Sequence, residues 1–71
     1  MVNTKVIQDK MRKNGFTLDS LAKEIGKSRT CLFNKIHNKS EFCVSEINKI
    51  SSLLKLNKAE MSRIFFADDV E

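Results

Sequence analysis

The stretch from residue 17 to residue 26 places the strictest limit on how this chain can fold. Four apolar residues recur at i, i+3, i+4 and i+7, the spacing of one apolar helix face: Leu18, Leu21, Ala22 and Ile25. Thr17 is a suitable N-cap before them, and Gly26 directly after them tolerates the positive φ that ends a helix. The pattern predicts a helix of about two turns. Such a helix is stable only when its apolar face packs against other elements.

Apolar periodicity and capping residues predict four further short helices. The chain has no Pro and only two Gly, whereas β-rich folds use both at their turns. We therefore expect an all-α fold, a compact five-helix bundle in one domain over residues 1–67. An acidic C-terminal tail over residues 68–71 is expected to fray. The expected helices cover residues 4–14, 17–25, 28–37, 44–54 and 57–67.

The expected helix over residues 28–37 has two different sides. Leu32 and Ile36 belong to the core side, and Lys35 lies at its border, where its ammonium group can reach water. The opposite arc of about 140° carries side chains for which an apolar core has no use. These are Arg29, Thr30, Phe33, Asn34 and His37.

Two expectations concern the second half of the chain. Glu46 and Lys49 are three residues apart and are expected to form a weak ion pair on the outer surface of their helix. In the last helix, Ile64 and Phe65 are expected to face inward. Phe66 has two open roles, which are contact with a partner subunit and closure of the core.

Positive charge is concentrated in the body of the chain. Residues 1–58 contain 12 Lys and Arg against 5 Asp and Glu, whereas residues 59–71 contain 1 against 4. A basic body with an acidic end suits a polyanionic partner that is met by one face only. Charge alone leaves open a domain whose lysines are merely solvated.

The sequence contains no pattern typical of membrane insertion, metal binding or catalysis. No apolar run approaches the roughly 20 residues that span a bilayer, and no signal-peptide segment follows Met1, so we expect a cytoplasmic protein. Cys31, His37 and Cys43 lack the number and spacing of zinc ligands, and the two thiols are expected to be small core residues. The single His has no neighbouring nucleophile, and there is no glycine-rich phosphate loop. We expect no enzyme activity, no cofactor and no small-molecule ligand.

The segment LDSLAKEIG, residues 18–26, followed by Ser28-Arg29-Thr30, resembles the Cro/repressor (Xre-type) helix-turn-helix family of phage regulators. The resemblance is greatest to small Cro-like proteins of phages from low-GC Gram-positive bacteria. Three later segments add to it: Ser40-Glu41-Phe42, residues 46–50 and residues 64–66. The resemblance spans residues 4–67. It implies a lambda-repressor-like bundle with a central helix-turn-helix, working in the cytoplasm of a bacterial host cell.

The resemblance also implies that the helix over residues 28–37 enters the major groove of a double-stranded DNA operator. The protein would then be a sequence-specific repressor. Arginine and asparagine suit this role, because they form bidentate contacts with guanine and adenine edges respectively. The base-contacting candidates are Arg29, Thr30, Asn34 and Phe33. The phosphate-contacting candidates are Thr17, Lys27, Ser28, His37, Asn38 and Lys39.

Several alternatives stay open at this point. Phe33 could contact a thymine methyl group or a sugar, or it could fold over Phe42. A homodimer on a palindromic site is a second expectation, with Phe66 as its contact. A helical protein-interaction module of the same fold, such as an antirepressor or antitoxin subunit, is the alternative function. It is suggested by Leu18, where phage repressors often have Gln, and by Lys27, where they usually have an apolar residue. An exposed Phe33 would also favour it.

Overall fold

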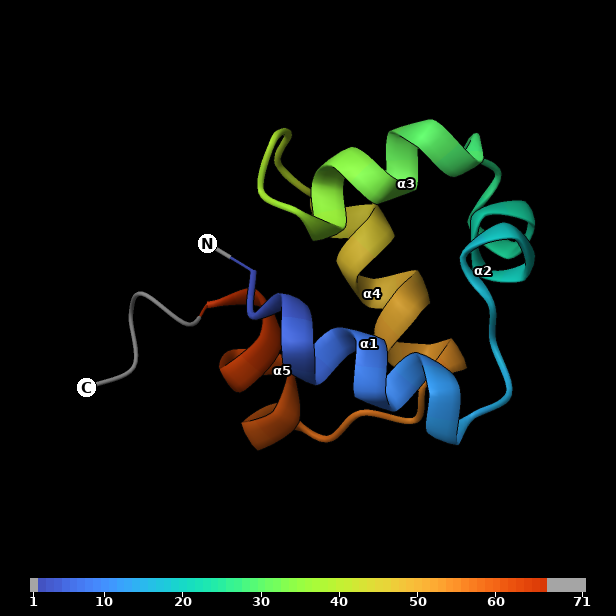
Figure 1. The fold of residues 1–71 in the computed structure, drawn as a ribbon. Coiled ribbons are helices and arrows are strands. Elements are labelled where there is room, and N and C mark those ends of the chain that lie inside the picture. Colours follow the sequence, from blue (N-terminus) through green and yellow to red (C-terminus); the bar gives the residue numbers. More distant parts are fainter. Residues whose placement is uncertain (1, 67–71) are drawn as a thin grey trace.

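The computed structural model describes residues 2–66 (Figure 1). Within this range the chain forms five helices and no strand, so the all-α, five-helix prediction is confirmed. The predicted ends of the first four helices are correct to within a residue or two. Ala67 and the predicted acidic tail lie outside the described residues. The helices are α1 (Thr4–Lys13), α2 (Leu18–Ile25), α3 (Arg29–Ile36), α4 (Val44–Leu53) and α5 (Lys58–Phe65).

Side chains that accept backbone N–H groups begin α1, α2, α3 and α5. At α2, the Thr17 hydroxyl accepts from the Ser20 N–H at 3.1 Å, and the Ser20 hydroxyl accepts from the Thr17 N–H at 2.9 Å. Such a reciprocal pair satisfies two donors that a helix start leaves free. Gly26 ends α2 with a φ of +74°, which a residue with a Cβ rarely adopts. The local signals in the sequence therefore place the helix ends correctly.

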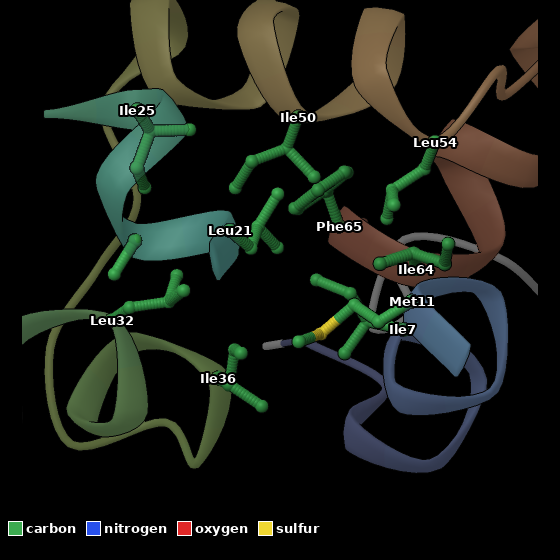
Figure 2. Close-up of a cluster of buried hydrophobic side chains, with 11 residues drawn as sticks. Ile7, Met11, Leu21, Ile25, Leu32, Ile36, Ile50, Leu54, Ile64 and Phe65 are labelled. Carbon is green, nitrogen blue, oxygen red and sulfur yellow. The ribbon is translucent and has the colours of Figure 1, made fainter. Parts of the chain in front are cut away.

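A single apolar cluster joins all five helices, and Figure 2 shows its side chains converging from each of them. Phe42, in the connection before α4, packs edge-on against Phe65 with ring centroids 5.4 Å apart. Ile47 and Leu53 are partly buried at the margin of the cluster. The buried residues are Ile7, Met11, Leu21, Ala22, Ile25, Leu32, Ile36, Ile50, Leu54, Ile64 and Phe65.

The prediction that Glu46 pairs with Lys49 on the outer surface is wrong. Glu46 is only 4% exposed, and its Oε1 accepts from the Lys35 ammonium at 2.6 Å and from the Cys43 N–H at 2.7 Å. Glu46 lies four residues before the buried Ile50, so the two share the inward face of α4. Lys35, which was expected to reach water, is also buried, because its ammonium group pairs with the buried Glu46 carboxylate. The connection between α3 and α4 reverses the chain and so brings Lys35 and Glu46 together.

Cys43 also differs from expectation, because it is exposed at the N-cap position of α4 rather than buried in the core. Cys31 on α3 is partly buried, and both thiols are free. The N-cap residue of a helix lies outside its apolar stripe, which explains the exposure of Cys43.

The Lys35–Glu46 pair makes the stability of the fold dependent on pH. Burial raises the pKa of Glu46, but the hydrogen bonds from the Cys43 N–H and from Lys35 outweigh burial, so the pKa falls below 4.5. The hydrogen bond to Glu46 raises the pKa of Lys35 above 10.5. The pair therefore contributes its full stability between these two values. That contribution is lost as the pH falls through the folded-state pKa of Glu46, or rises through that of Lys35.

We expect Glu46→Gln to lower the free energy of unfolding at pH 7 by about 3 kcal/mol, because it leaves a buried ammonium group without its carboxylate. The variant should also lose less stability than the wild type when the pH is lowered from 5 to 3. Urea unfolding at a series of pH values measures both effects. Glu24→Gln, at an exposed position on α2, is the matched control and should change neither. An acid dependence equal to that of the wild type would contradict the assignment.

Candidate nucleic-acid interface

The connection over residues 26–28 sets the angle between α2 and α3. The Lys27 N–H donates to the Ala22 carbonyl at 2.9 Å, which closes the end of α2. The Ser28 hydroxyl accepts from the Cys31 N–H at 3.1 Å and begins α3. Figure 1 shows the result, with α3 lying along one edge of the molecule and α2 at its N-terminal end. One side of α3 is therefore free of other helices.

The two sides of α3 differ as the periodicity predicts. Leu32 and Ile36 are buried in the core, and Figure 2 shows both pointing toward the other helices. The opposite side carries three exposed residues and two that are partly exposed, in the order Arg29, Thr30, Phe33, then Asn34 and His37. The structure therefore brings all five residues of the predicted outer arc onto one accessible surface.

Arg29 has one weak partner in the described structure. Its Nε lies 3.7 Å from Oδ1 of Asp19, and the two side chains are 68% and 69% exposed. Exposed ion pairs of this kind contribute about 0–1 kcal/mol. The guanidinium fork of Arg29 is therefore available to a ligand at small cost.

Phe33 lies at the surface and does not fold over Phe42. The residue is 41% exposed, and its ring is tilted against that of His37, with centroids 4.2 Å apart. The ammonium group of Lys39 lies 5.9 Å from the centroid of the Phe33 ring, within range of a cation–π contact. Phe42 pairs with Phe65 instead. Phe33, His37 and Lys39 thus form one small cluster around the C-terminal end of α3.

A hollow lies between α1 and the flank of α3, and we call it the α1–α3 hollow. Gln8 and Arg12 reach it from α1, and neither was predicted as a site residue. Their distance from α3 in the sequence left no local signal, because only the packing of α1 against the bundle places them there. None of the lining residues is acidic. They are Gln8, Met11, Arg12, Phe16, Leu18, Arg29, Phe33, Ile36 and His37.

The candidate phosphate contacts differ in how free their side chains are. Thr17 and Ser28 are exposed, although their hydroxyls cap α2 and α3. Lys27 is exposed, with its Nζ 3.9 Å from Oε2 of Glu46. Asn38 is already engaged, because its Oδ1 accepts from the Val2 N–H at 2.6 Å and its Nδ2 donates to the Val2 carbonyl at 3.0 Å. The Asn38 side chain therefore anchors the start of the chain, and a phosphate would have to compete with Val2 for it.

Two further properties concern residues 2–66. In this range no helix is long and apolar enough to cross a membrane. No three His, Cys, Asp or Glu side chains in the same range lie close enough together to hold a metal ion.

Comparison with known proteins gives limited information. No family model matches the chain, and no solved structure matches it significantly. A curated protein from Formosa agariphila, described as histidine kinase P4, is 32% identical over 68 residues. The match covers 87% of this chain but only 5% of that protein. The chain thus spans a small part of the length of this relative.

The Ser28 hydroxyl caps α3, the helix that carries the outer surface. Removing this cap should therefore change the stability of the protein. We expect Ser28→Ala to lower the free energy of unfolding by about 1 kcal/mol, because the Cys31 N–H loses its acceptor. Ser28→Gly should cost only a few tenths of a kcal/mol, since glycine is tolerated at an N-cap. Urea unfolding of both variants gives the comparison. Equal stability of the wild type and Ser28→Ala would show that the cap does not contribute.

Proposed function

We propose that this protein is a sequence-specific regulator of transcription that binds double-stranded DNA, a Cro-like repressor encoded by a phage or prophage. In this proposal α3 enters the major groove, and the bound protein blocks transcription by occupying an operator. The observation that carries the proposal is the accessible outer side of α3, where Arg29, Thr30 and Asn34 lie together. These side chains have the donors and acceptors that read base edges.

Local charge supports the proposal. Between residues 23 and 39 the chain has five cationic side chains and one carboxylate, Glu24. The five are Lys23, Lys27, Arg29, Lys35 and Lys39. Lys35 is neutralised inside the protein by Glu46, so the remaining cations carry the positive field of this surface. A field of that sign attracts the DNA backbone and accelerates encounter.

The surface divides into base-reading and backbone-binding parts. Arg29 matches O6 and N7 of guanine, Asn34 matches N6 and N7 of adenine, and Thr30 can hydrogen-bond a base or contact a thymine methyl group. The helix starts at Thr17 and Ser28 offer backbone N–H groups to phosphate. Arg12, across the α1–α3 hollow from Arg29, extends the cationic surface onto α1.

Alanine substitution should separate the two kinds of contact. Duplexes enriched by the protein from random DNA serve as the probe, and binding is titrated at several salt concentrations. We expect log K to fall steeply with log salt concentration. Arg29→Ala should weaken the enriched site about tenfold or more and relax its sequence preference. Lys39→Ala should weaken all sequences alike and reduce the salt slope by about 1.

Two results would contradict the proposal. Unchanged affinity of Arg29→Ala and Asn34→Ala for the enriched duplex would show that α3 does not read the bases. Failure to retain any duplex, together with capture of a protein partner, would favour the alternative function, a helical protein-interaction module such as an antirepressor or antitoxin subunit.

We further propose that two copies bind a palindromic site as a homodimer. Phe66, just after α5, is 44% exposed and borders a surface groove whose apolar wall includes Phe42, Ile47 and Phe65. A two-fold interface brings the same patch of both subunits together, so an exposed apolar group here would be covered by its copy. Such a dimer would place two α3 helices about 34 Å apart along the DNA.

Sedimentation tests the dimer directly. The wild type should associate at high micromolar concentration, and Phe66→Ala should shift the equilibrium toward the monomer because it removes apolar contact area. Phe33→Ala is the matched control, since Phe33 is similarly exposed on a different surface. It should leave the association constant unchanged. A strictly monomeric wild type under these conditions would remove the argument for Phe66.

A further inference from the structure

We propose that α3 reads a base step in which guanine neighbours a 5-methylpyrimidine, with Phe33 packed against the C5-methyl group and Arg29 bound to the guanine. Thymine and 5-methylcytosine both supply this methyl group. The inference rests on the proposed DNA-binding function and specifies what one part of that surface recognises.

The positions of Arg29 and Phe33 carry the inference. They are four residues apart on α3, so they are neighbours on one flank of the helix, and both line the α1–α3 hollow. Side chains at this spacing have Cβ atoms about 5–6 Å apart. Base pairs follow one another at about 3.4 Å along DNA. The two side chains therefore reach the same base pair or adjacent ones.

Phe33 offers an apolar surface that the fold itself does not use. The residue is 41% exposed, and its ring lies against the His37 ring and within 5.9 Å of the Lys39 ammonium group. A ring that is already held in place loses little conformational entropy on binding. Within the major groove, the thymine C5-methyl is the apolar group that distinguishes one base from the others. A methyl group is therefore the base feature that suits Phe33.

Arg29 supplies the second half of the step. Its exposed pairing with Asp19 is weak, so its fork can turn to O6 and N7 of guanine. No acidic residue lines the hollow that Arg29 and Phe33 share. A DNA phosphate at the hollow therefore meets no carboxylate from its lining, and Asp19, 3.7 Å from the Arg29 Nε, is the carboxylate beside it. Asp19 itself lies outside the hollow lining.

The test changes one methyl group on the DNA. Duplexes enriched by the full chain from random DNA should contain thymine next to guanine. Replacing that thymine with uracil removes only the methyl group and should weaken binding about fourfold, as expected when one methyl group stays in water. In a second arm the same position carries a C·G pair, with and without a C5-methyl on the cytosine. Methylation should strengthen binding by a similar factor.

Variants assign the effect to Phe33. In Phe33→Ala the thymine and uracil duplexes should bind with equal affinity. Val44→Ala removes exposed apolar surface at the start of α4, away from α3, and should keep the thymine preference. The ratio of the two affinities is the readout, so a general loss of affinity in either variant does not affect the comparison. Circular dichroism confirms that both variants are folded.

The outcomes separate this inference from the proposed function. Sequence-selective binding with equal affinity for thymine and uracil would overturn the inference and leave the proposed function standing. A thymine preference that survives Phe33→Ala would also overturn it. If Phe33→Ala weakens both duplexes equally while the wild type shows no preference, the ring contacts sugar rather than methyl. Failure to enrich any sequence would remove the proposed function and the inference together.

Discussion

The placement of α3 depends on the buried ion pair between Lys35 and Glu46. α3 has eight residues, of which only Leu32 and Ile36 insert fully into the core, and a helix this short has little stability of its own. Lys35 gives it a third attachment, on the side that faces α4. Because Glu46 also accepts the Cys43 N–H, the same carboxylate begins α4 and holds α3. Disruption of the pair would leave a buried charge and loosen both helices at once.

This attachment leaves the opposite side of α3 free for recognition. The core side chains and Lys35 restrain the helix, while Arg29, Thr30 and Asn34 do not contribute to the apolar cluster. Substitutions on the outer side can therefore change what the protein binds at small cost to its stability. The α1–α3 hollow widens this surface beyond one helix, since Arg12 reaches it from α1. A rigid support with replaceable side chains suits the proposed reading of one DNA sequence among many.

Sequence reasoning succeeded where the cause is local. The cap at Thr17 and the turn at Gly26 depend on neighbouring residues, and the structure has them as predicted. It failed where the cause is distant. Glu46 was assigned to the surface because of its spacing from Lys49, whereas its actual partner, Lys35, lies eleven residues away on another helix. The side-chain bonds of Asn38 to Val2 span 36 residues and had no sequence signal.

The sequence by itself determined the five helices, their apolar faces and the outer arc of α3, because periodicity and capping act within a few residues along the chain. Only the tertiary structure decided what surrounds that arc. It brought Arg12 beside α3, kept Phe33 at the surface against His37, and buried Lys35 with Glu46. These contacts arise when helices distant in sequence pack together, and each charged or aromatic side chain then takes the partner that the packing makes available.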